Sequence, residues 1–317
     1  MIKRNKIKIA IISVITILFV GITYIVGRMV YDGSIGSKPE VSVQAMSEYY
    51  ESNEDKLLEE LNSYKQEKKL IKSEKNGYDI EVLNIKSNEE TNNSMIVVHG
   101  IERNYHDVLN TAFNYLENGY NVVVYNQRQT GNTGGDNYTF GLYERFDLDS
   151  VVDYTAESYK DGLLGVHGFS MGAATATMHT ELNEEKKNVD FYILDAPYHT
   201  MKSGIEMGIK RKDIPLLPIE YATFAGSVYA KIKCGFSYND VKPFESVKNI
   251  TTPVMLIHGS EDDYTSVAGS KIIYDTIPHN KKELWIIEGL KHCKADDIIE
   301  EEYFERIDKF INEKIKS

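Results

Sequence analysis

The sequence predicts a doubly wound, mostly parallel α/β sheet with a small helical lid and one N-terminal transmembrane helix. Three observations predict it. A long apolar run lies near the N-terminus, short apolar runs alternate with longer helical stretches, and one long interval breaks this alternation. Short, fully apolar runs are typical of strands that are buried on both faces, as in parallel sheets covered by helices.

The composition is that of an ordinary globular chain without a disulfide framework. Of the 317 residues, 42% are hydrophobic and 26% are charged, which suits one large domain with appendages. The two cysteines, Cys234 and Cys293, can form at most one bridge. The chain contains neither a CxxC pair nor an HExxH run, so the sequence predicts no metal site.

Charge is distributed unevenly along the chain. The formal net charge is -12, but residues 1–30 hold five basic and no acidic side chains, which leaves -17 on the remainder. A body this acidic repels phosphate backbones, so we expect no nucleic-acid partner. The simplest role of the negative charge is solubility.

Residues 9–27 carry no charged side chain and are dominated by Ile, Val, Leu and Phe. At 1.5 Å per residue a helix of this length spans about 28 Å, close to the roughly 30 Å core of a bilayer. A cleaved signal peptide would have a shorter run and a small-x-small cleavage site, whereas RMVY follows here at 28–31. We therefore expect residues 1–30 to be a single-pass signal anchor in the cell membrane. The basic cluster before the run predicts an extracytoplasmic body.

Residues 31–70 are expected to form a linker followed by a helix that leads to the body. The linker part contains Gly and Ser, and the composition then turns to Glu, Lys, Leu and Tyr. Asn76-Gly77 predicts a type I′ turn that joins strands over 70–75 and 78–85.

The body, residues 71–317, alternates short apolar runs with helical stretches. Strands are expected at 95–98, 122–125, 163–166, 192–194, 254–257 and 284–287. Helices are expected at 106–118, 143–159 and 173–183. This order is typical of a doubly wound sheet.

The interval between the strands that end at 194 and begin at 254 contains no clear strand. It includes an apolar stretch at 219–232 with Phe224, Val228 and Tyr229. Structureless loops of this length are uncommon, so we expect a helical lid at about 198–250 over the carboxyl edge of the sheet. The apolar stretch either contacts an acyl chain or packs against the sheet.

The segment GFSMG at 168–172 matches the pattern G-x-S-x-G. It follows an expected strand and precedes a run of small residues that can start a helix. In such a strand–turn–helix setting the serine is held on a strained elbow, and the helix N-terminus favours developing negative charge. These features indicate a nucleophile at Ser170; the alternative is a plain glycine-rich turn.

A serine hydroxyl is a poor nucleophile until a base takes its proton. His292 alone among eight histidines follows both the candidate acids and the last expected strand, at the edge where parallel strands end. The other histidines precede a glycine at a strand end, lie upstream of the acids, or lie at the opposite edge. They are His99, His106, His167, His179, His199, His258 and His279.

Four carboxylates are candidates for the acid that orients this base. Glu261, Asp262 and Asp263 are consecutive after the next-to-last strand, and Asp195 ends an earlier strand. Of these, Asp262 stands four residues after His258.

Together these segments resemble the α/β-hydrolase superfamily, in the branch of compact bacterial serine hydrolases with a short lid. The resemblance covers residues 71–317, and the order of its motifs is more specific than any single one. The motifs are VVHG at 97–100, YNQRQTGNTGG at 125–135, TFGLYERFDL at 139–148, HGFSMG at 167–172, PVMLIHGSEDDYTS at 253–266 and GLKHC at 289–293. Asn126 departs from the family, where many members have Asp, and residues 129–132 replace its usual Gly-His-Gly-x-Ser.

The resemblance implies an α/β-hydrolase fold with a Ser170, Asp262 and His292 triad. In the family's HGxxD pattern Asp262 is the acid, and His292 is the base. The oxyanion hole would consist of the backbone N–H groups of Ile101 and Met171.

The implied function is hydrolysis of a carboxylic ester or related acyl substrate through an acyl-enzyme, without a metal or organic cofactor. The expected partners are a small-molecule acyl substrate and, through the N-terminal helix, the membrane. One alternative is a short-peptide hydrolase of the same fold. Another is a catalytically inactive surface binding module, which would have no need for all three triad groups.

Overall fold

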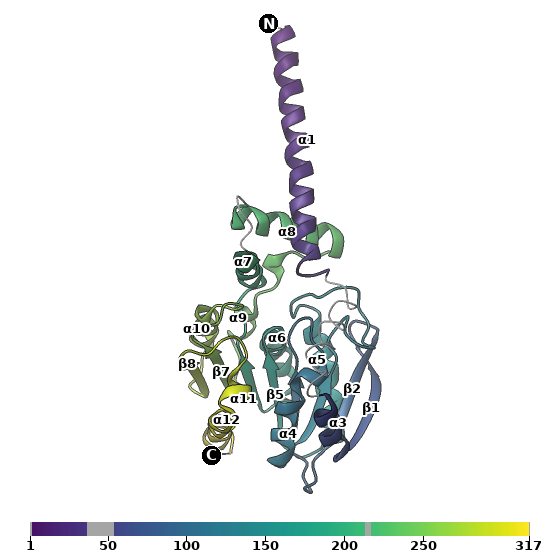
Figure 1. Cartoon of the computed structure of the whole chain (residues 1–317), viewed down its shortest axis with the longest axis vertical. Helices are drawn as coiled ribbons and strands as arrows, with labels where there is room; N and C mark the ends of the chain where they lie inside the picture. The colour runs from purple at the N-terminus through teal and green to yellow at the C-terminus, as the bar shows by residue number, and fades with distance from the viewer. Residues whose placement is uncertain (1, 37–53, 213–216, 317) are drawn as a thin grey trace.

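An eight-stranded, mostly parallel sheet organises the body (Figure 1). The computed structural model describes residues 2–36, 54–212 and 217–316. The strands are β1 (Lys65–Lys72), β2 (Asp79–Lys86), β3 (Ser94–Val98), β4 (Asn121–Tyr125), β5 (Leu164–Phe169), β6 (Phe191–Asp195), β7 (Val254–Gly259) and β8 (Lys282–Ile287). Their order is β1-β2-β4-β3-β5-β6-β7-β8, and only the β1–β2 and β2–β4 pairs are antiparallel. The predicted doubly wound sheet is confirmed.

Helices cover both faces of this sheet. One face packs against α3 (Glu54–Asn62), α4 (Leu109–Glu117) and α12 (Glu300–Lys314). The other packs against α5 (Glu144–Ser158), α6 (Met171–Lys186) and α10 (Val267–Thr276). Side chains of a strand alternate between the two cores. In β3, for example, Met95 and Val97 belong to the first core and Ile96 and Val98 to the second. The short helices η1 (Tyr105–Val108) and α11 (Ala295–Ile298) complete the loops on the first face.

The start of the body differs from the prediction. The expected leading helix ends at Asn62, and the chain enters β1 at Lys65, where it pairs with β2; residues 37–53 of the expected linker and helix lie outside the described part. The type I′ turn is wrong, because the connection spans residues 73–78 and positive φ is found at Gly77 alone of the predicted pair. The Asn76 amide donates instead to Asp147 of α5, at 2.8 Å.

Between β6 and β7 the described chain forms helices and no strand. They are α7 (Met201–Lys212), α8 (Ile219–Cys234), η2 (Tyr238–Asp240) and α9 (Pro243–Ser246). Residues 213–216 fall within the predicted lid but lie outside the described residues. Because β6 leads directly into α7, these helices leave the sheet at its carboxyl edge, and Figure 1 shows α7 and α8 between the sheet and the N-terminal helix.

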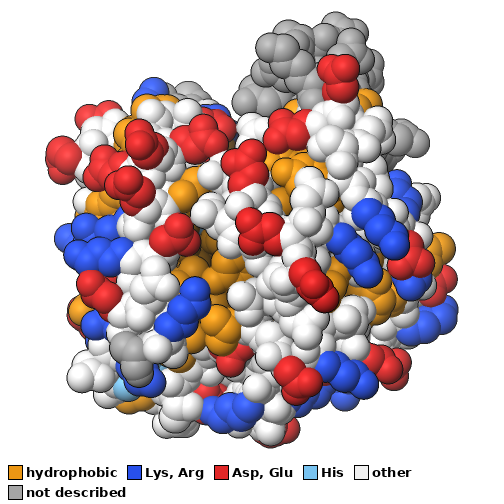
Figure 2. Space-filling view, turned by 90° about the horizontal axis from the view of Figure 1, so that it is seen from below, with side chains coloured by type: hydrophobic (Ala, Val, Ile, Leu, Met, Phe, Trp, Pro, Cys, Tyr) orange, Lys and Arg blue, Asp and Glu red, His pale blue; other side chains and the backbone are white. Residues whose placement is uncertain are grey.

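The N-terminal helix α1 (Ile2–Asp32) projects from the body (Figure 1). Its apolar part has a mean hydropathy of 2.7 and is long enough to cross a membrane. Among residues 5–32 of α1, the last turns are the part that the body covers, and Tyr31 and the following Ile35 are buried in a cluster with α7 and α8. Figure 2 shows the end of the body away from α1, where acidic and basic side chains lie around apolar patches near the middle of the face.

Candidate active site

Ser170 stands at a sharp turn between the end of β5 and the start of α6. Its backbone has φ 54° and ψ -114°, a conformation that residues with side chains rarely adopt. The Ser170 N–H donates to the carbonyl oxygen of Asp195 at 2.8 Å, which ties the turn to the end of β6. Ser170 is only partly buried, so this strained turn leaves the hydroxyl accessible at the carboxyl edge of the sheet.

Two glycines allow this turn to pack closely. A Cβ atom on Gly168 would lie 2.5 Å from the carbonyl oxygen of Gly172, and one on Gly172 would lie 2.3 Å from the carbonyl oxygen of Val98. Both distances are too short for a real contact with a backbone atom. The G-x-S-x-G pattern therefore has a steric cause in this fold.

His292 lies between Ser170 and Asp262. Its Nε2 is 2.9 Å from the Ser170 hydroxyl oxygen, and its Nδ1 is 2.6 Å from Oδ2 of Asp262. The three side chains follow β5, β7 and β8, so the parallel sheet brings them to one edge. With Nδ1–H donating to the carboxylate, Nε2 is left to accept the hydroxyl proton. The structure thus brings together the three side chains that the sequence singled out.

The Asp262 carboxylate is fully buried and surrounded by donors. Its Oδ1 accepts the N–H groups of Tyr264 and Thr265 at 2.8 and 2.9 Å, and its Oδ2 accepts the Thr265 hydroxyl at 3.0 Å. Burial acts to raise the pKa of Asp262, but hydrogen bonds from His258 and His292 outweigh it and hold this pKa well below its usual value. Asp262 therefore stays ionised and can stabilise a protonated His292.

The other three candidate acids lie in different environments. Glu261 and Asp263 are exposed. Asp195 is buried and accepts the Tyr303 hydroxyl at 2.8 Å. Burial, reinforced by the nearby carboxylate of Asp296, raises the pKa of Asp195 to about 8. A carboxyl group that is mostly protonated at neutral pH is a poor partner for an imidazolium.

Two buried histidines, His99 directly after β3 and His167 within β5, connect the segments beneath the site. Burial lowers the pKa of His99 to about 4 and the pKa of His167 to about 3, so both are neutral. His99 Nε2 accepts the N–H of Gln127 at 2.9 Å, which connects the ends of β3 and β4. His167 lies between the hydroxyls of Tyr115 and Tyr303, at 3.0 Å from each.

His258 has a more specific position than the sequence suggested. Its Nδ1 lies 2.7 Å from the Ser270 hydroxyl, and its Nε2 lies 3.1 Å from Oδ2 of Asp262. When Ser270 donates to Nδ1, Nε2 carries the proton and donates to the carboxylate. The spacing from His258 to Asp262 was the sequence signal for this contact.

The predicted oxyanion-hole residues lie on two segments that meet at Ser170. Met171 is the first residue of α6, so its N–H has no acceptor within the helix. Ile101 follows Gly100, where an added Cβ would be 3.5 Å from the Ser170 Cβ. The Ile101 and Met171 side chains also belong to one apolar cluster.

Tyr264 and Arg211 form a stack on His292 that the sequence did not predict. The Tyr264 ring lies parallel to the imidazole, with centroids 5.0 Å apart and an interplanar angle of 14°. The guanidinium carbon of Arg211, in α7, lies 3.4 Å from the Tyr264 ring centroid. The sulfur of Cys293 is 3.7 Å from His292 Nε2. The first two contacts connect α7 to His292, and nothing in the local sequence predicts them.

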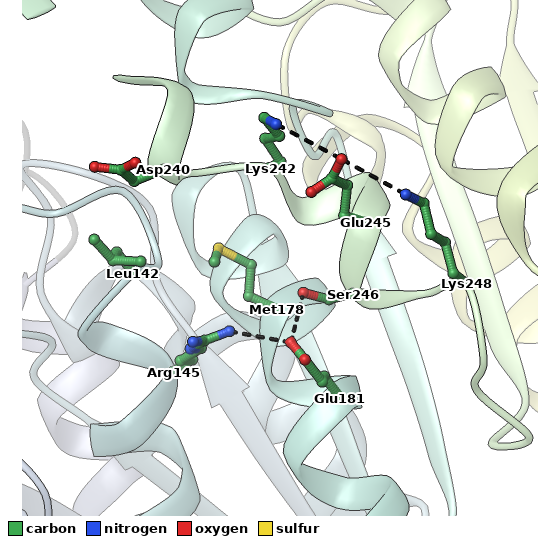
Figure 3. A pocket seen from close by; sticks show the side chains of 9 residues that line it. All are labelled: Leu142, Arg145, Met178, Glu181, Asp240, Lys242, Glu245, Ser246 and Lys248. Carbon is green, nitrogen blue, oxygen red and sulfur yellow. Dashed lines mark hydrogen bonds and ion pairs between the residues drawn. The ribbon is translucent and has the colours of Figure 1, made fainter. Parts of the chain in front are cut away.

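A cavity of about 370 Å³ lies between α5, α6 and α9, and none of Ser170, Asp262 and His292 lines it (Figure 3). Its charged side chains are paired, Asp240 with Lys231 outside the cavity at 3.6 Å and the others among themselves. Arg145 contacts Glu181 at 3.3 Å, and Glu245 lies 3.6 Å from Lys242 and equally far from Lys248. These charges are already compensated, so the candidate site remains the serine turn.

Comparison with known proteins agrees with the fold. A family model described as "Serine aminopeptidase, S33" matches residues 89–240 and 241–297. YqkD of Bacillus subtilis, described as uncharacterized, is 30% identical over 224 residues, which cover 69% of this chain and 70% of YqkD. A kynurenine formamidase of Meyerozyma guilliermondii is 26% identical over 220 residues, covering 62% of this chain and 76% of that enzyme. Among solved structures, the Pyrococcus furiosus esterase Pf2001 superposes with a TM-score of 0.64 at 23% identity, over 80% of this chain and 94% of that one.

Proposed function

Because the chain belongs to the serine aminopeptidase S33 family of α/β-hydrolases, we propose that it is a serine hydrolase of carboxylic esters or related acyl substrates. The observation that carries this proposal is the position of His292, within hydrogen-bond distance of both the Ser170 hydroxyl and the Asp262 carboxylate. A hydroxyl, a base and an orienting acid in this order are what acyl transfer to serine needs.

Acyl transfer would proceed in two steps. His292 takes the Ser170 proton as the oxygen attacks the acyl carbonyl, and then gives that proton to the leaving alcohol as the acyl-enzyme forms. Water next attacks the acyl-enzyme while His292 takes a proton from the water, and the acid product leaves as Ser170 regains its proton. Asp262 holds the imidazole and stabilises its positive form in both steps.

The developing oxyanion would be bound by the N–H groups of Met171 and Ile101. Met171 N–H is supported by the start of α6, where unpaired backbone donors favour negative charge. Ile101 N–H is supported by the close approach of Gly100 to Ser170. Loss of one such donor typically costs about 100- to 1,000-fold in kcat.

Hydrolysis of short peptides is a second candidate, because the matching family model is described as a serine aminopeptidase. The same Ser170, Asp262 and His292 would act on an amide carbonyl. The two candidates differ in substrate and not in catalytic groups.

We further propose that α1 anchors the enzyme in a membrane, with the body on the extracytoplasmic side. The length and hydropathy of α1 support an anchor, and the basic residues before the apolar run support a cytoplasmic N-terminus. The predicted lid, with α7 and α8, would then lie between the membrane and the carboxyl edge that carries Ser170.

Labelling with a fluorophosphonate probe tests the nucleophile. The detergent-solubilised full-length chain should be labelled, and Ser170→Ala should not. Ser158→Ala, an exposed serine at the end of α5, is the matched control and should be labelled normally. Retained labelling of Ser170→Ala would contradict the proposal. Relative rates on p-nitrophenyl esters and on aminoacyl p-nitroanilides then separate the ester and peptide candidates.

A further inference from the structure

Three apolar side chains form a stripe on the surface of α8. Phe224, Val228 and Ile232 are four residues apart, so they share one face of the helix. They are 55%, 36% and 81% exposed. Contiguous exposed apolar side chains of this kind mark a contact surface.

The opposite face of α8 packs on the body. Ala222 and Ala230 are fully buried, and an added Cβ on Gly226 would lie 2.6 Å from the Tyr238 hydroxyl oxygen. These positions are offset by two residues from the stripe, which places them on the other side of a helix with 3.6 residues per turn. The stripe therefore faces away from the side of α8 that packs on the body. Figure 1 shows that α1 extends beyond α8 on the side away from the sheet.

α8 crosses α1 where the apolar run of α1 ends. An added Cβ on Gly27 would lie 2.5 Å from the carbonyl oxygen of Ala225, so the two helices touch backbone to backbone. Gly27 is also the last residue of the uncharged segment 9–27. If α1 spans a bilayer, α8 lies at the depth where α1 leaves the hydrocarbon core.

Aromatic side chains surround this crossing. The Tyr221 ring lies 6.2 Å from that of Phe19, and the Tyr229 ring lies 5.4 Å from Tyr24 and 5.2 Å from Tyr31. Tyrosine is enriched at membrane–water interfaces, where an apolar ring and a polar hydroxyl meet both environments. These aromatic side chains therefore lie near the depth at which α1 would leave the hydrocarbon core.

The helices next to the crossing are basic, although the body is acidic. Together α7 and α8 contain six basic and two acidic residues, whereas the chain after residue 30 has a formal charge of -17. All six basic residues are exposed: Lys202, Lys210, Arg211, Lys212, Lys231 and Lys233. Basic side chains beside an apolar helix face attract anionic lipid headgroups.

We propose that α8 lies in the plane of the membrane, with Phe224, Val228 and Ile232 inserted among the lipid chains beside α1. The inference rests on the proposed anchoring by α1. We take a lipid bilayer as the partner of this surface, because an apolar stripe, tyrosine rings and exposed basic side chains are the three kinds of group that bind a membrane interface.

Docking of α8 also orients the site. The carboxyl edge of the sheet, which carries Ser170, leads into α7, and Arg211 of α7 contacts the Tyr264 ring that stacks on His292. This edge then faces the bilayer. Amphiphiles whose acyl group lies at the membrane surface are therefore the substrate class that the site would meet.

Tryptophan quenching by brominated phospholipids tests the docking. The chain has one tryptophan, Trp285, so a Trp285→Phe background isolates new probes in the full-length protein reconstituted into phosphatidylcholine and phosphatidylglycerol vesicles. Ile232→Trp should be quenched, more by lipids brominated near the headgroup than by lipids brominated near the chain end. Ile298→Trp, at a 61% exposed apolar site on α11, is the matched control and should not be quenched.

Ile12→Trp, in the apolar run of α1, reports the anchor independently. Quenching at Ile12 without quenching at Ile232 would overturn the docking of α8 and leave the anchor intact, and quenching at neither would overturn both. A blue-shifted but unquenched Ile232→Trp signal that grows with the protein-to-lipid ratio would show that a second copy covers the stripe, which also overturns the proposal. Fluorophosphonate labelling of the same variants reports Ser170 separately, so failure of the nucleophile assignment is distinguishable.

Discussion

The Nε2 atom of His258 lies 3.1 Å from Oδ2 of Asp262, and both side chains are fully buried. The same oxygen lies 2.6 Å from His292. The imidazole of His258 therefore holds the Asp262 carboxylate in place, and this carboxylate orients the imidazole of His292. This arrangement makes His258 a positioning residue for the acid.

Replacing His258 should affect the pH profile as well as the rate. In His258→Leu the hydrogen bond that lowers the pKa of Asp262 is lost, so this pKa should rise and the acid-side loss of activity should move to higher pH. We expect kcat to fall about 10- to 100-fold, the rate equivalent of one hydrogen bond to a charged group. His258→Gln, which keeps a donor, should recover part of the rate; an unshifted profile in the Leu variant would show that His258 is only structural.

Asp262→Asn should be the most damaging of the acid substitutions. Removing the orienting acid of such a triad costs about 10,000-fold in kcat, because the imidazole then takes the wrong tautomer. Asp263→Asn, next in sequence but exposed, is the matched control and should change kcat little. Steady-state kcat values on a p-nitrophenyl ester test this order. A severe loss of kcat in Asp195→Asn together with an active Asp262→Asn would show that the orienting acid is Asp195, at the end of β6.

Asp195→Asn should make the protein more stable than the wild type, and this difference should grow as the pH rises. Burial and the Asp296 carboxylate raise the pKa of Asp195 to about 8, above its usual value of 3.8. When folding raises the pKa of a carboxyl group, the protein is most stable at a pH below the pKa of that group in the unfolded chain. This contribution to the free energy of unfolding is lost progressively as the pH rises toward the pKa in the folded protein. Asparagine stays neutral and can still accept the Tyr303 hydroxyl. The difference in Tm between the variant and the wild type should therefore grow from pH 5 to pH 8, and a constant difference would refute the assignment.

Gly172→Ala should destabilise the fold strongly, since the new methyl group would lie 2.3 Å from the carbonyl oxygen of Val98. We expect a loss of about 1–3 kcal/mol, as for other overpacked sites. Gly208→Ala in α7 is the matched control, because nothing lies within 4 Å of the added Cβ, and alanine favours a helix by about 1 kcal/mol. Urea unfolding of both variants should give shifts of opposite sign.

The proposed topology predicts that a protease added to wall-less cells digests the body and spares the N-terminus. A tag placed before residue 1 should then remain on a short, membrane-bound fragment. Protection of the body in intact cells, with digestion only after permeabilisation, would reverse the orientation. A mature protein that begins near residue 30 would instead indicate cleavage of a signal peptide.

The sheet and the serine turn were predictable because their signals are local. Fully apolar runs located β3 to β7 closely, since a strand buried on both faces tolerates few polar side chains. A Cβ atom at position 168 or 172 would clash with the backbone, so both positions are glycine and the G-x-S-x-G pattern around Ser170 is visible in the sequence. His292 was also predictable, because chain order and sheet edge are both visible in the sequence.

Contacts between distant segments were not predictable. β1 has no buried residue and pairs with β2 alone at the sheet edge, so its first residues resembled a helix rich in Glu and Lys. The stack of Arg211 on Tyr264 joins α7 to the loop after β7 and has no local pattern. Phe224 and Val228 could not be assigned to a core or a surface by hydrophobicity alone; their exposure on α8 rules out packing against the sheet.

The contact between α1 and α8 also imposes an order on biosynthesis. The Thr23 and Tyr221 hydroxyls, 2.8 Å apart, are separated by 198 residues along the chain. At about 5–20 residues per second, α8 would leave the ribosome roughly 10–40 seconds after the segment that it will contact. The first helix must therefore stay without this partner while β1 to β6 are synthesised. The junction between the two helices can therefore form only after β6 has been synthesised, with β7 and β8 still to follow.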